Sequence, residues 1–151
     1  MRFASREKAV FGQPEVAGGV LPGGGANERL PRLMGRGRAL EVILGSDDFD
    51  AETAERYGWI NRCLPDSELD AFVDQLAKRI ASFDGEVIGV AKRLVNRASL
   101  PSGEDFLESQ DAFLAAARRP ELKPRLLKAR ERAAAVGADF ELRLGHYLGN
   151  L

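Results

Sequence analysis

The sequence is poor in the residues that build disulfides, metal centres and histidine-based catalytic sites. Among 151 residues, Cys63 is the only cysteine and His146 the only histidine. One cysteine excludes a disulfide within the chain and a cysteine-rich metal site, which favours a reducing, cytoplasmic location. One histidine lacks the partners of a catalytic triad or a metal centre. We expect Cys63 to be a buried strand residue, His146 to lie at a surface or an interface, and no metal to bind.

An excess of charge and long apolar runs are also missing. The 22 Lys and Arg residues nearly balance 23 Asp and Glu residues, for a net charge of −1. This balance argues against a general nucleic-acid binder and against binding to an anionic membrane. No run of about 18 apolar residues occurs, and the first ten residues lack the apolar core of a signal peptide. We therefore expect neither nucleic acid nor a membrane as a partner.

The most informative segment is FGQPEVAGGVLPGGGANERLPRLMGRGRA, residues Phe11–Ala39. Val10 and Phe11 predict a short buried strand. Pro14 has no N–H and cannot continue an inner ladder, so the strand should end there. Glu15 is then expected just past the end of the strand.

A glycine-rich loop and a helix start follow Glu15 closely. Pro22 and the glycines 23–25 predict a loop whose backbone another group can approach, and residues 26–33 predict a short helix. The free N–H groups of that helix would face the loop. Such a site can hold a water or an anion against a general acid or base. On spacing alone, a surface glutamate beside a simple turn is the favoured explanation of the pattern.

The motifs of this chain closely resemble the second half of the enoyl-CoA hydratase/isomerase family, the crotonase superfamily. They follow one another in the family's order from Met1 to about Ala98: RFAS, FGQPE, PGGGANERLPRL, GRGRALEVILG and AETAERYGWINRCLP. The resemblance implies an α/β, helix-rich fold with few short strands. Residues 1–98 would form the second half of a crotonase-like ββα superhelix. Residues 99–151 would form the α-helical region with which family members build trimers or pairs of trimers, which implies a homo-oligomer.

The resemblance also implies a chemistry on acyl-coenzyme A thioesters. Glu15 matches the second of two glutamates that hold the water added by hydratases, and the carboxylate that shuttles the proton in isomerases. Gly23, next to Pro22, matches the loop glycine whose N–H faces the reacting water. Lys128 falls near a position that contacts coenzyme A phosphates, although Arg125 stands where an aromatic residue is expected nearby. No separate cofactor is implied, because coenzyme A is part of the substrate.

The other half of the family's site would lie upstream of Met1. That half supplies the first glutamate, both N–H groups of the oxyanion hole, and the loops that grip the adenosine end of coenzyme A. One oxyanion donor is worth about 3 to 4 kcal/mol of transition-state stabilisation. We therefore expect a half-protein that is nearly inert alone and whose unpaired strand edges promote association.

Apolar periodicity predicts amphipathic helices through the second part of the chain. We expect helices at residues 68–83, capped by Ser67, and at residues 85–98, both with apolar faces in the core. Three further helices are expected at residues 104–119, 120–136 and 139–148.

Four arginines between the glycine loop and the next helix allow two interpretations. They could meet a phosphate, or they could form a solvated face paired with neighbouring glutamates. The arginines are Arg29, Arg32, Arg36 and Arg38, and the glutamates are Glu28 and Glu41.

Three hypotheses about function stay open at this point. The chain can belong to an acyl-CoA lyase or isomerase in which Glu15 is the acid/base residue. It can instead be a non-catalytic interaction module, kept for the oligomerising helices of residues 104–148. It can also be a truncated product with no independent role.

Overall fold

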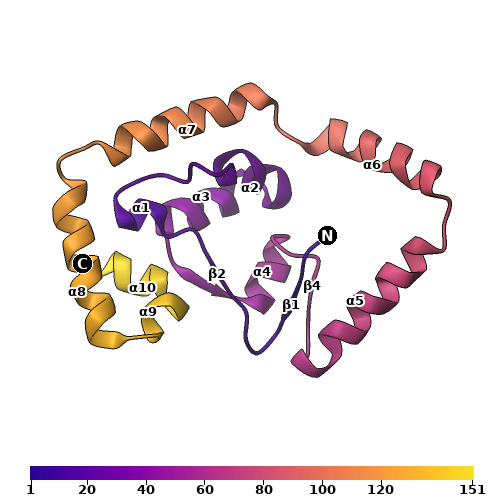
Figure 1. Ribbon diagram of the computed structural model, residues 1–151, viewed down its shortest axis with the longest axis horizontal. Coiled ribbons are helices and arrows are strands. Elements are labelled where there is room, and N and C mark those ends of the chain that lie inside the picture. The colour runs from indigo at the N-terminus through magenta and orange to yellow at the C-terminus, as the bar shows by residue number, and fades with distance from the viewer. The chain divides into compact units, whose positions relative to one another are not determined.

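The computed structural model describes residues 1–151 and contains ten helices and four short strands (Figure 1). The chain divides into two compact units, each of which combines an early and a late segment. Unit 1 comprises Met1–Ala9 and Ala51–Leu100, and unit 2 comprises Val10–Asp50 and Pro101–Leu151. None of the helices has both the length and the apolar character needed to cross a membrane. The predicted boundary at residue 98, between the crotonase-like core and the helical oligomerisation region, stays a prediction.

Unit 1 is built on a parallel pair of strands. β1 pairs with β4, and Ala4 lies opposite Cys63. Ala51 and Ala54 of α4 are completely buried, as small residues allow where a helix approaches a strand closely. The elements of this unit are β1 (Phe3–Ser5), α4 (Ala51–Tyr57), β4 (Arg62–Leu64), α5 (Asp66–Ala81) and α6 (Gly85–Ser99).

Local signals set most of the boundaries in unit 1. Gly58, with φ 80°, follows the end of α4, as its sequence position suggests. Trp59 and Ile60 are buried in the turn that precedes β4. The carboxylate of Asp84 caps α6 by accepting two backbone N–H groups. The predicted cap at Ser67 is wrong, because α5 begins one residue earlier and has no side-chain cap.

Cys63 is buried in a strand, as predicted, and it joins β4 to α4 through Glu55. Both the backbone N–H and the thiol of Cys63 donate to Glu55 Oε2, each at 2.9 Å. The bond from the thiol is the main reason that the pKa of Glu55 is lowered, and the bond to the carboxylate raises the pKa of Cys63. Cys63 therefore acts here as a hydrogen-bond donor within the fold.

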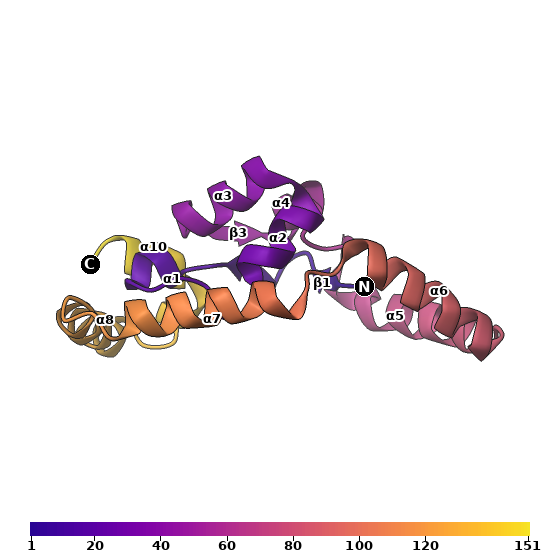
Figure 2. The ribbon, with the colours of Figure 1, turned by 90° about the horizontal axis from the view of Figure 1, so that it is seen from above.

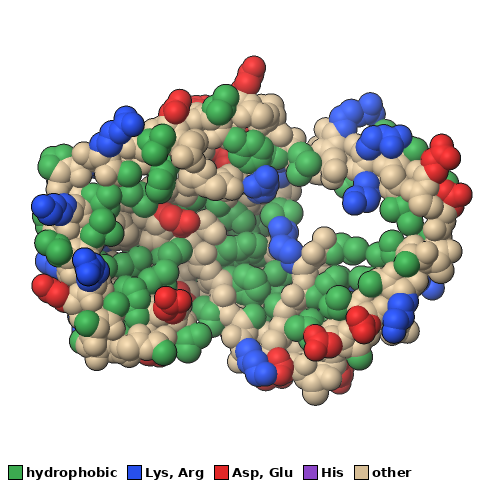
Figure 3. Space-filling view, viewed as in Figure 1, with side chains coloured by type: hydrophobic (Ala, Val, Ile, Leu, Met, Phe, Trp, Pro, Cys, Tyr) green, Lys and Arg blue, Asp and Glu red, His purple; other side chains and the backbone are tan.

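The apolar faces of α5 and α6 are not core in this chain, contrary to the prediction. No residue of either helix is buried, and Val87, Leu94 and Val95 are 66%, 51% and 63% exposed. Phe72 contacts Phe3 edge-on, with 5.1 Å between ring centroids, and so attaches α5 to β1. Figure 3 shows hydrophobic side chains open to view along both helices. Exposed apolar surface of this kind is typical of an interaction face.

Unit 2 contains the second strand pair and seven helices. β2 pairs antiparallel with β3, and Phe11 lies opposite Phe49. Val10 is 49% exposed, so the first strand of this pair is not buried as predicted. The elements are β2 (Val10–Gly12), α1 (Glu15–Gly18), α2 (Ala26–Met34), α3 (Arg36–Gly45), β3 (Asp48–Asp50), α7 (Gly103–Ala117), α8 (Leu122–Val136), α9 (Asp139–Leu142) and α10 (Leu144–Gly149).

The core of unit 2 lies between α2 and α3. Gly35, with φ 81°, separates these helices and lets them fold onto each other. Five apolar residues are buried there: Leu30, Met34, Ala39, Val42 and Ile43. The helix predicted at residues 139–148 is broken at Arg143, whose φ of −135° is not helical.

Truncation of Val42 should destabilise the chain far more than truncation of Leu44 on the same helix. Val42 is fully buried, whereas Leu44 is 63% exposed. Val42→Ala removes buried methyl groups and leaves a cavity, so we expect a loss of about 2 kcal/mol in the free energy of unfolding. Leu44→Ala should change it by less than about 0.5 kcal/mol. Urea denaturation followed by circular dichroism measures both, and equal losses would contradict this core.

Acid should weaken the link between Glu55 and Cys63. Because folding lowers the pKa of Glu55, the folded state binds this proton less readily than the unfolded chain. The stabilisation is complete above the unfolded pKa, about 4.3, and is lost as the pH falls through the lower folded pKa. For this exposed side chain we expect Glu55→Gln to reduce stability at pH 7 by at most about 1 kcal/mol.

The difference between Glu55→Gln and wild type should then shrink as the pH falls towards about 3. Urea denaturation at the two pH values measures it. Asp74→Asn, an exposed change on α5, is the control and should show no such convergence. A difference for Glu55→Gln that stays constant with pH would contradict the assigned link.

Candidate active site

Glu15 is the first residue of α1, which begins three residues after β2 ends. The prediction placed it at a strand end, and the structure places it at the start of a short helical turn. Its Oε2 atom is buried and has no hydrogen-bond partner within the chain. A buried polar atom without a partner costs free energy, and in natural proteins it calls for a functional explanation. Glu15 is therefore a candidate for chemistry.

Two side chains from distant segments hold α1 by the backbone of Ala17. Its N–H donates to Ser46 Oγ at 3.1 Å, and its carbonyl accepts from Arg125 Nε. A second nitrogen of the Arg125 guanidinium donates to the carbonyl of Leu148 at 3.0 Å, which joins α1, α8 and α10. Arg125 thus helps to fix the turn that carries Glu15.

Ser46 reaches Ala17 because of its unusual backbone. It is the one non-glycine residue with positive φ, 52°, and it follows the end of α3. Its hydroxyl donates to the carbonyl of Ile43 at 3.1 Å and accepts from Ala17. Serine next to a short apolar helix end is a common pattern, so the sequence offered no specific signal for this contact.

The group that approaches the glycine loop closely is α7. A Cβ atom on Gly23 would lie 2.8 Å from the Phe113 side chain, and one on Gly25 would lie 2.5 Å from the Phe106 ring. Gly25 also has φ 93°, which other residues rarely adopt. Gly24 has open space around it. Figure 2 shows α7 running beside α2, which begins directly after this loop.

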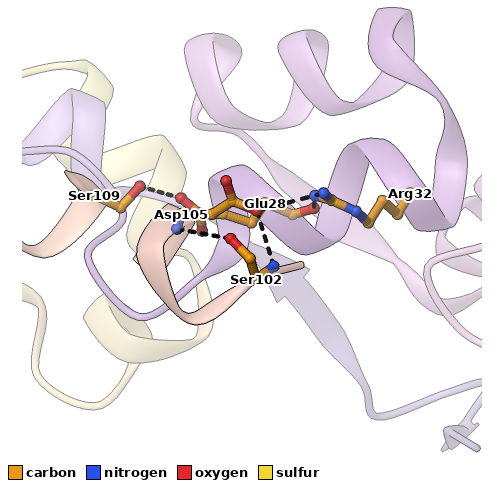
Figure 4. A network of polar contacts seen from close by, with 5 residues as sticks. All are labelled: Glu28, Arg32, Ser102, Asp105 and Ser109. Carbon is orange, nitrogen blue, oxygen red and sulfur yellow. Dashed lines mark hydrogen bonds and ion pairs between the residues drawn. The ribbon is translucent and has the colours of Figure 1, made fainter. Parts of the chain in front are cut away.

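Pro22, predicted to bind substrate, is fully buried, and its carbonyl accepts a hydrogen bond from Asn27 Nδ2 at 2.7 Å. Glu28, which follows Asn27 in the chain, is also buried and accepts a hydrogen bond from Ser109 of α7 (Figure 4). Asn27, Glu28 and Ser109 are among the residues that line an open groove of about 440 Å³. The contact between α2 and α7 is therefore partly polar.

The arginines near the loop are engaged within the chain. Arg29 lies over the Phe106 ring, 4.6 Å from its centroid. Arg32 lies 3.6 Å from Asp105, which in turn forms a capping box with Ser102 at the start of α7 (Figure 4). For these two arginines the structure favours the interpretation of a paired surface over that of a phosphate site.

Lys128 lies on the exposed side of α8 and not at the glycine loop. It lines an open groove of about 390 Å³ together with Glu131, Arg132, Ala135, Asn150 and Leu151. Glu15 and Gly23 are not part of this groove. His146 is exposed, as predicted, and its backbone N–H donates to Asp48. No group of acidic, histidine or cysteine residues could hold a metal ion.

Comparisons with known proteins agree with this architecture. The sequence profile of the family "Enoyl-CoA hydratase/isomerase" matches residues 2–119. The chain belongs to this family. A Rhizobium meliloti protein named "Probable enoyl-CoA hydratase" is 37% identical over 137 residues, which cover 79% of this chain and 52% of that protein.

A solved structure from Streptomyces avermitilis, assigned as an enoyl-CoA hydratase, extends the agreement to the fold. It superimposes on 100% of this chain and 54% of its own, with a TM-score of 0.95 and 45% identity. The carnitinyl-CoA hydratase of Mycobacterium avium superimposes on 86% of the chain with a TM-score of 0.77 and 26% identity. The predicted family and its helix-rich crotonase fold are thereby confirmed. The chain spans about half the length of these relatives.

Alanine at Gly25 and alanine at Gly24 should have opposite consequences. Gly25→Ala forces an L-residue into positive φ, which costs about 1 to 2 kcal/mol, and drives Cβ into Phe106. We expect a loss of about 2 kcal/mol or more in the free energy of unfolding. Gly24→Ala meets no atom within 4 Å and should be neutral or stabilise by up to about 1 kcal/mol. Thermal denaturation measures both, and similar losses would argue against the docking of α7 on this loop.

Proposed function

We propose that this chain supplies one half of an acyl-CoA-processing site, in which Glu15 is the acid/base residue. The reaction is water addition to an enoyl-CoA thioester or a shift of its double bond. The observation that carries the proposal is the buried, unpartnered Oε2 atom of Glu15. The two-sided hold on Ala17 supports it, because a proton-transferring group must be fixed in position to act efficiently.

The other predicted residues have supporting roles in this proposal. The N–H of Gly23 orients the water or the substrate, and buried Pro22 fixes the entry of the loop. Lys128 attracts the phosphates of coenzyme A from its separate groove, and coenzyme A enters as part of the substrate. The other catalytic glutamate and the oxyanion-hole N–H groups come from polypeptide outside these residues. We therefore propose that the chain alone has almost no activity and that the complete enzyme is a homo-oligomer.

The chemistry of Glu15 follows from the balance of protons in hydration. The oxygen of water forms a bond to the β-carbon while the π electrons of the double bond move towards the thioester. A carboxylate takes one proton from this water, and the α-carbon receives one proton, so the elements of water are added without any redox change. In a double-bond shift, Glu15 instead removes a proton at one carbon and returns it at another. Either role requires a carboxylate shielded from bulk water.

The exposed apolar faces of α5 and α6 support a second candidate function. A non-catalytic fragment that binds other copies of the family through such faces would need no complete site. Size-exclusion chromatography with light scattering distinguishes this case. A purely monomeric chain would count against it.

The catalytic proposal is tested by restoring the complete site. The chain is fused to the remaining part of the Streptomyces avermitilis relative, and hydration of crotonyl-CoA is followed by the loss of enoyl absorbance. We expect the fusion to be active and Glu15→Gln to lower kcat by a factor of about 100 or more, because general acid/base groups contribute that much. Glu68→Gln, an exposed change on α5, should leave kcat unchanged.

Two outcomes would contradict the catalytic proposal. Equal rates for Glu15→Gln and wild type would remove Glu15 from the reaction. A fusion with a native circular dichroism spectrum and no activity on crotonyl-CoA or on 3-enoyl-CoA would exclude both water addition and the double-bond shift as the reaction.

A further inference from the structure

We infer that Asn27 orients the amide of Gly23, and that Ser109 and Glu28 hold Asn27 in the orientation this requires. The three side chains are positioning residues and do not touch the reacting atoms. The inference rests on the proposed function, since it assigns the Gly23 N–H to the site. It adds a hydrogen-bonded chain that connects α7 to this amide.

The first step is the geometry of a single peptide unit. Asn27 Nδ2 donates to the Pro22 carbonyl at 2.7 Å. That carbonyl and the N–H of Gly23 belong to the same planar peptide group, which is trans because the chain contains no cis peptide bond. In a trans peptide the two groups point in opposite directions. A side chain that fixes the carbonyl therefore fixes the direction of the N–H.

The second step is the direction of the hydrogen bonds. The Nδ2 group carries two hydrogens, and the second is donated to Ser109 Oγ at 3.3 Å. The single hydroxyl hydrogen of Ser109 is donated to Glu28 Oε1. Because the carboxylate takes this hydrogen, Ser109 must accept from Asn27. Each donor in the chain from Asn27 to Glu28 thus has one assigned acceptor (Figure 4 shows its Ser109–Glu28 link).

The third step is burial, which gives these bonds their strength. Ser109 is 8% exposed and Glu28 is 9% exposed. Hydrogen bonds to a charged acceptor are about twice as strong as neutral ones, and screening by water is weak where solvent is excluded. Rotation of Ser109 away from Glu28 would leave a buried carboxylate with no partner for either oxygen, because Oε2 already has none. The Ser109 hydroxyl is therefore held in one rotamer.

The fourth step is why Gly23 needs such a hold. The loop belongs to no helix or strand, so no ladder of backbone bonds fixes it. Glycine has the greatest conformational freedom of all residues, and a Cβ atom on neighbouring Gly24 would meet no atom within 4 Å. Arg29 donates to the Gly24 carbonyl at 3.2 Å, which restrains a later peptide group and not the one that contains the Gly23 N–H. Phe113 covers Gly23 from the side of α7 but is apolar and cannot orient an N–H. The bond from Asn27 supplies the missing direction.

The inference is tested by measuring backbone motion at Gly23 in the intact chain. Order parameters from ¹⁵N relaxation are compared for wild type, Asn27→Asp, Ser109→Ala and Ser109→Thr. Asn27→Asp replaces the donor with an oxygen of the same size, and Ser109→Ala removes the hydroxyl on which Asn27 depends. Ser109→Thr keeps that hydroxyl. Glu108→Gln, beside Ser109 on α7 and without a bond to this chain of residues, is the matched control.

We expect an order parameter of about 0.85 at Gly23 in wild type, Ser109→Thr and Glu108→Gln. It should fall below about 0.6 in Asn27→Asp and Ser109→Ala, while α2 and α3 keep their values. In the active fusion, Asn27→Asp should lower kcat about tenfold and change KM less than twofold, because an amide acting in the transition state loses its direction.

Unchanged order at Gly23 in both disruptive variants would overturn the inference, whatever the enzyme does. Loss of order throughout α2 and α3 would also overturn it, since the residues would then stabilise the unit in general. A mobile Gly23 in the variants together with an inactive wild-type fusion would leave the positioning role standing and overturn the proposed function instead. The two proposals therefore fail separately.

Discussion

The docking of α7 on the glycine loop is the contact on which the rest of unit 2 depends. Phe113 and Phe106 approach Gly23 and Gly25 to distances that no Cβ atom would allow. Both glycines are thus required by packing, and Gly25 is also required by its positive φ. The same docking brings Ser109 within reach of α2, so that one helix from the late part of the chain closes a loop from its early part. Loop, helix start and covering helix form a single structural element.

The carboxylates of Glu15 and Glu28 each have one buried oxygen, Oε2, without a hydrogen-bond partner in the chain. Glu28 receives a hydrogen bond from Ser109, and its burial is explained by the contact between α2 and α7. The Oε2 atom of Glu15 has no partner in the chain, yet it is removed from water. Burial of a carboxylate is unfavourable unless other interactions compensate for it. The hydrogen bonds at Ala17 hold the short helix that carries Glu15, and the unpartnered oxygen of Glu15 can accept a hydrogen bond from a group outside the chain.

Glycines and apolar periodicity in the sequence predicted those helices whose ends are set by neighbouring residues. The glycines beside α2 and the helical period gave this helix to within about a residue. Arg125 and Ser46 could not be recognised, because their partners lie 108 and 29 residues away and neither has a motif. The strand β3 was missed because its three residues, two of them aspartates, show no apolar alternation in the sequence. Glu15 and Gly23 were predicted from family resemblance, since spacing alone favoured a simple turn.

The wrong prediction about α5 and α6 has a physical explanation of its own. Apolar periodicity records that a helix face has been selected to lie against an apolar surface, and it does not say which polypeptide provides that surface. Here Phe72 reaches Phe3, but Val87, Leu94 and Val95 remain open to solvent. The chain spans about half the length of its relatives, so a covering surface can come from further polypeptide of the same fold or from other copies. In either case these faces would add stability only after association.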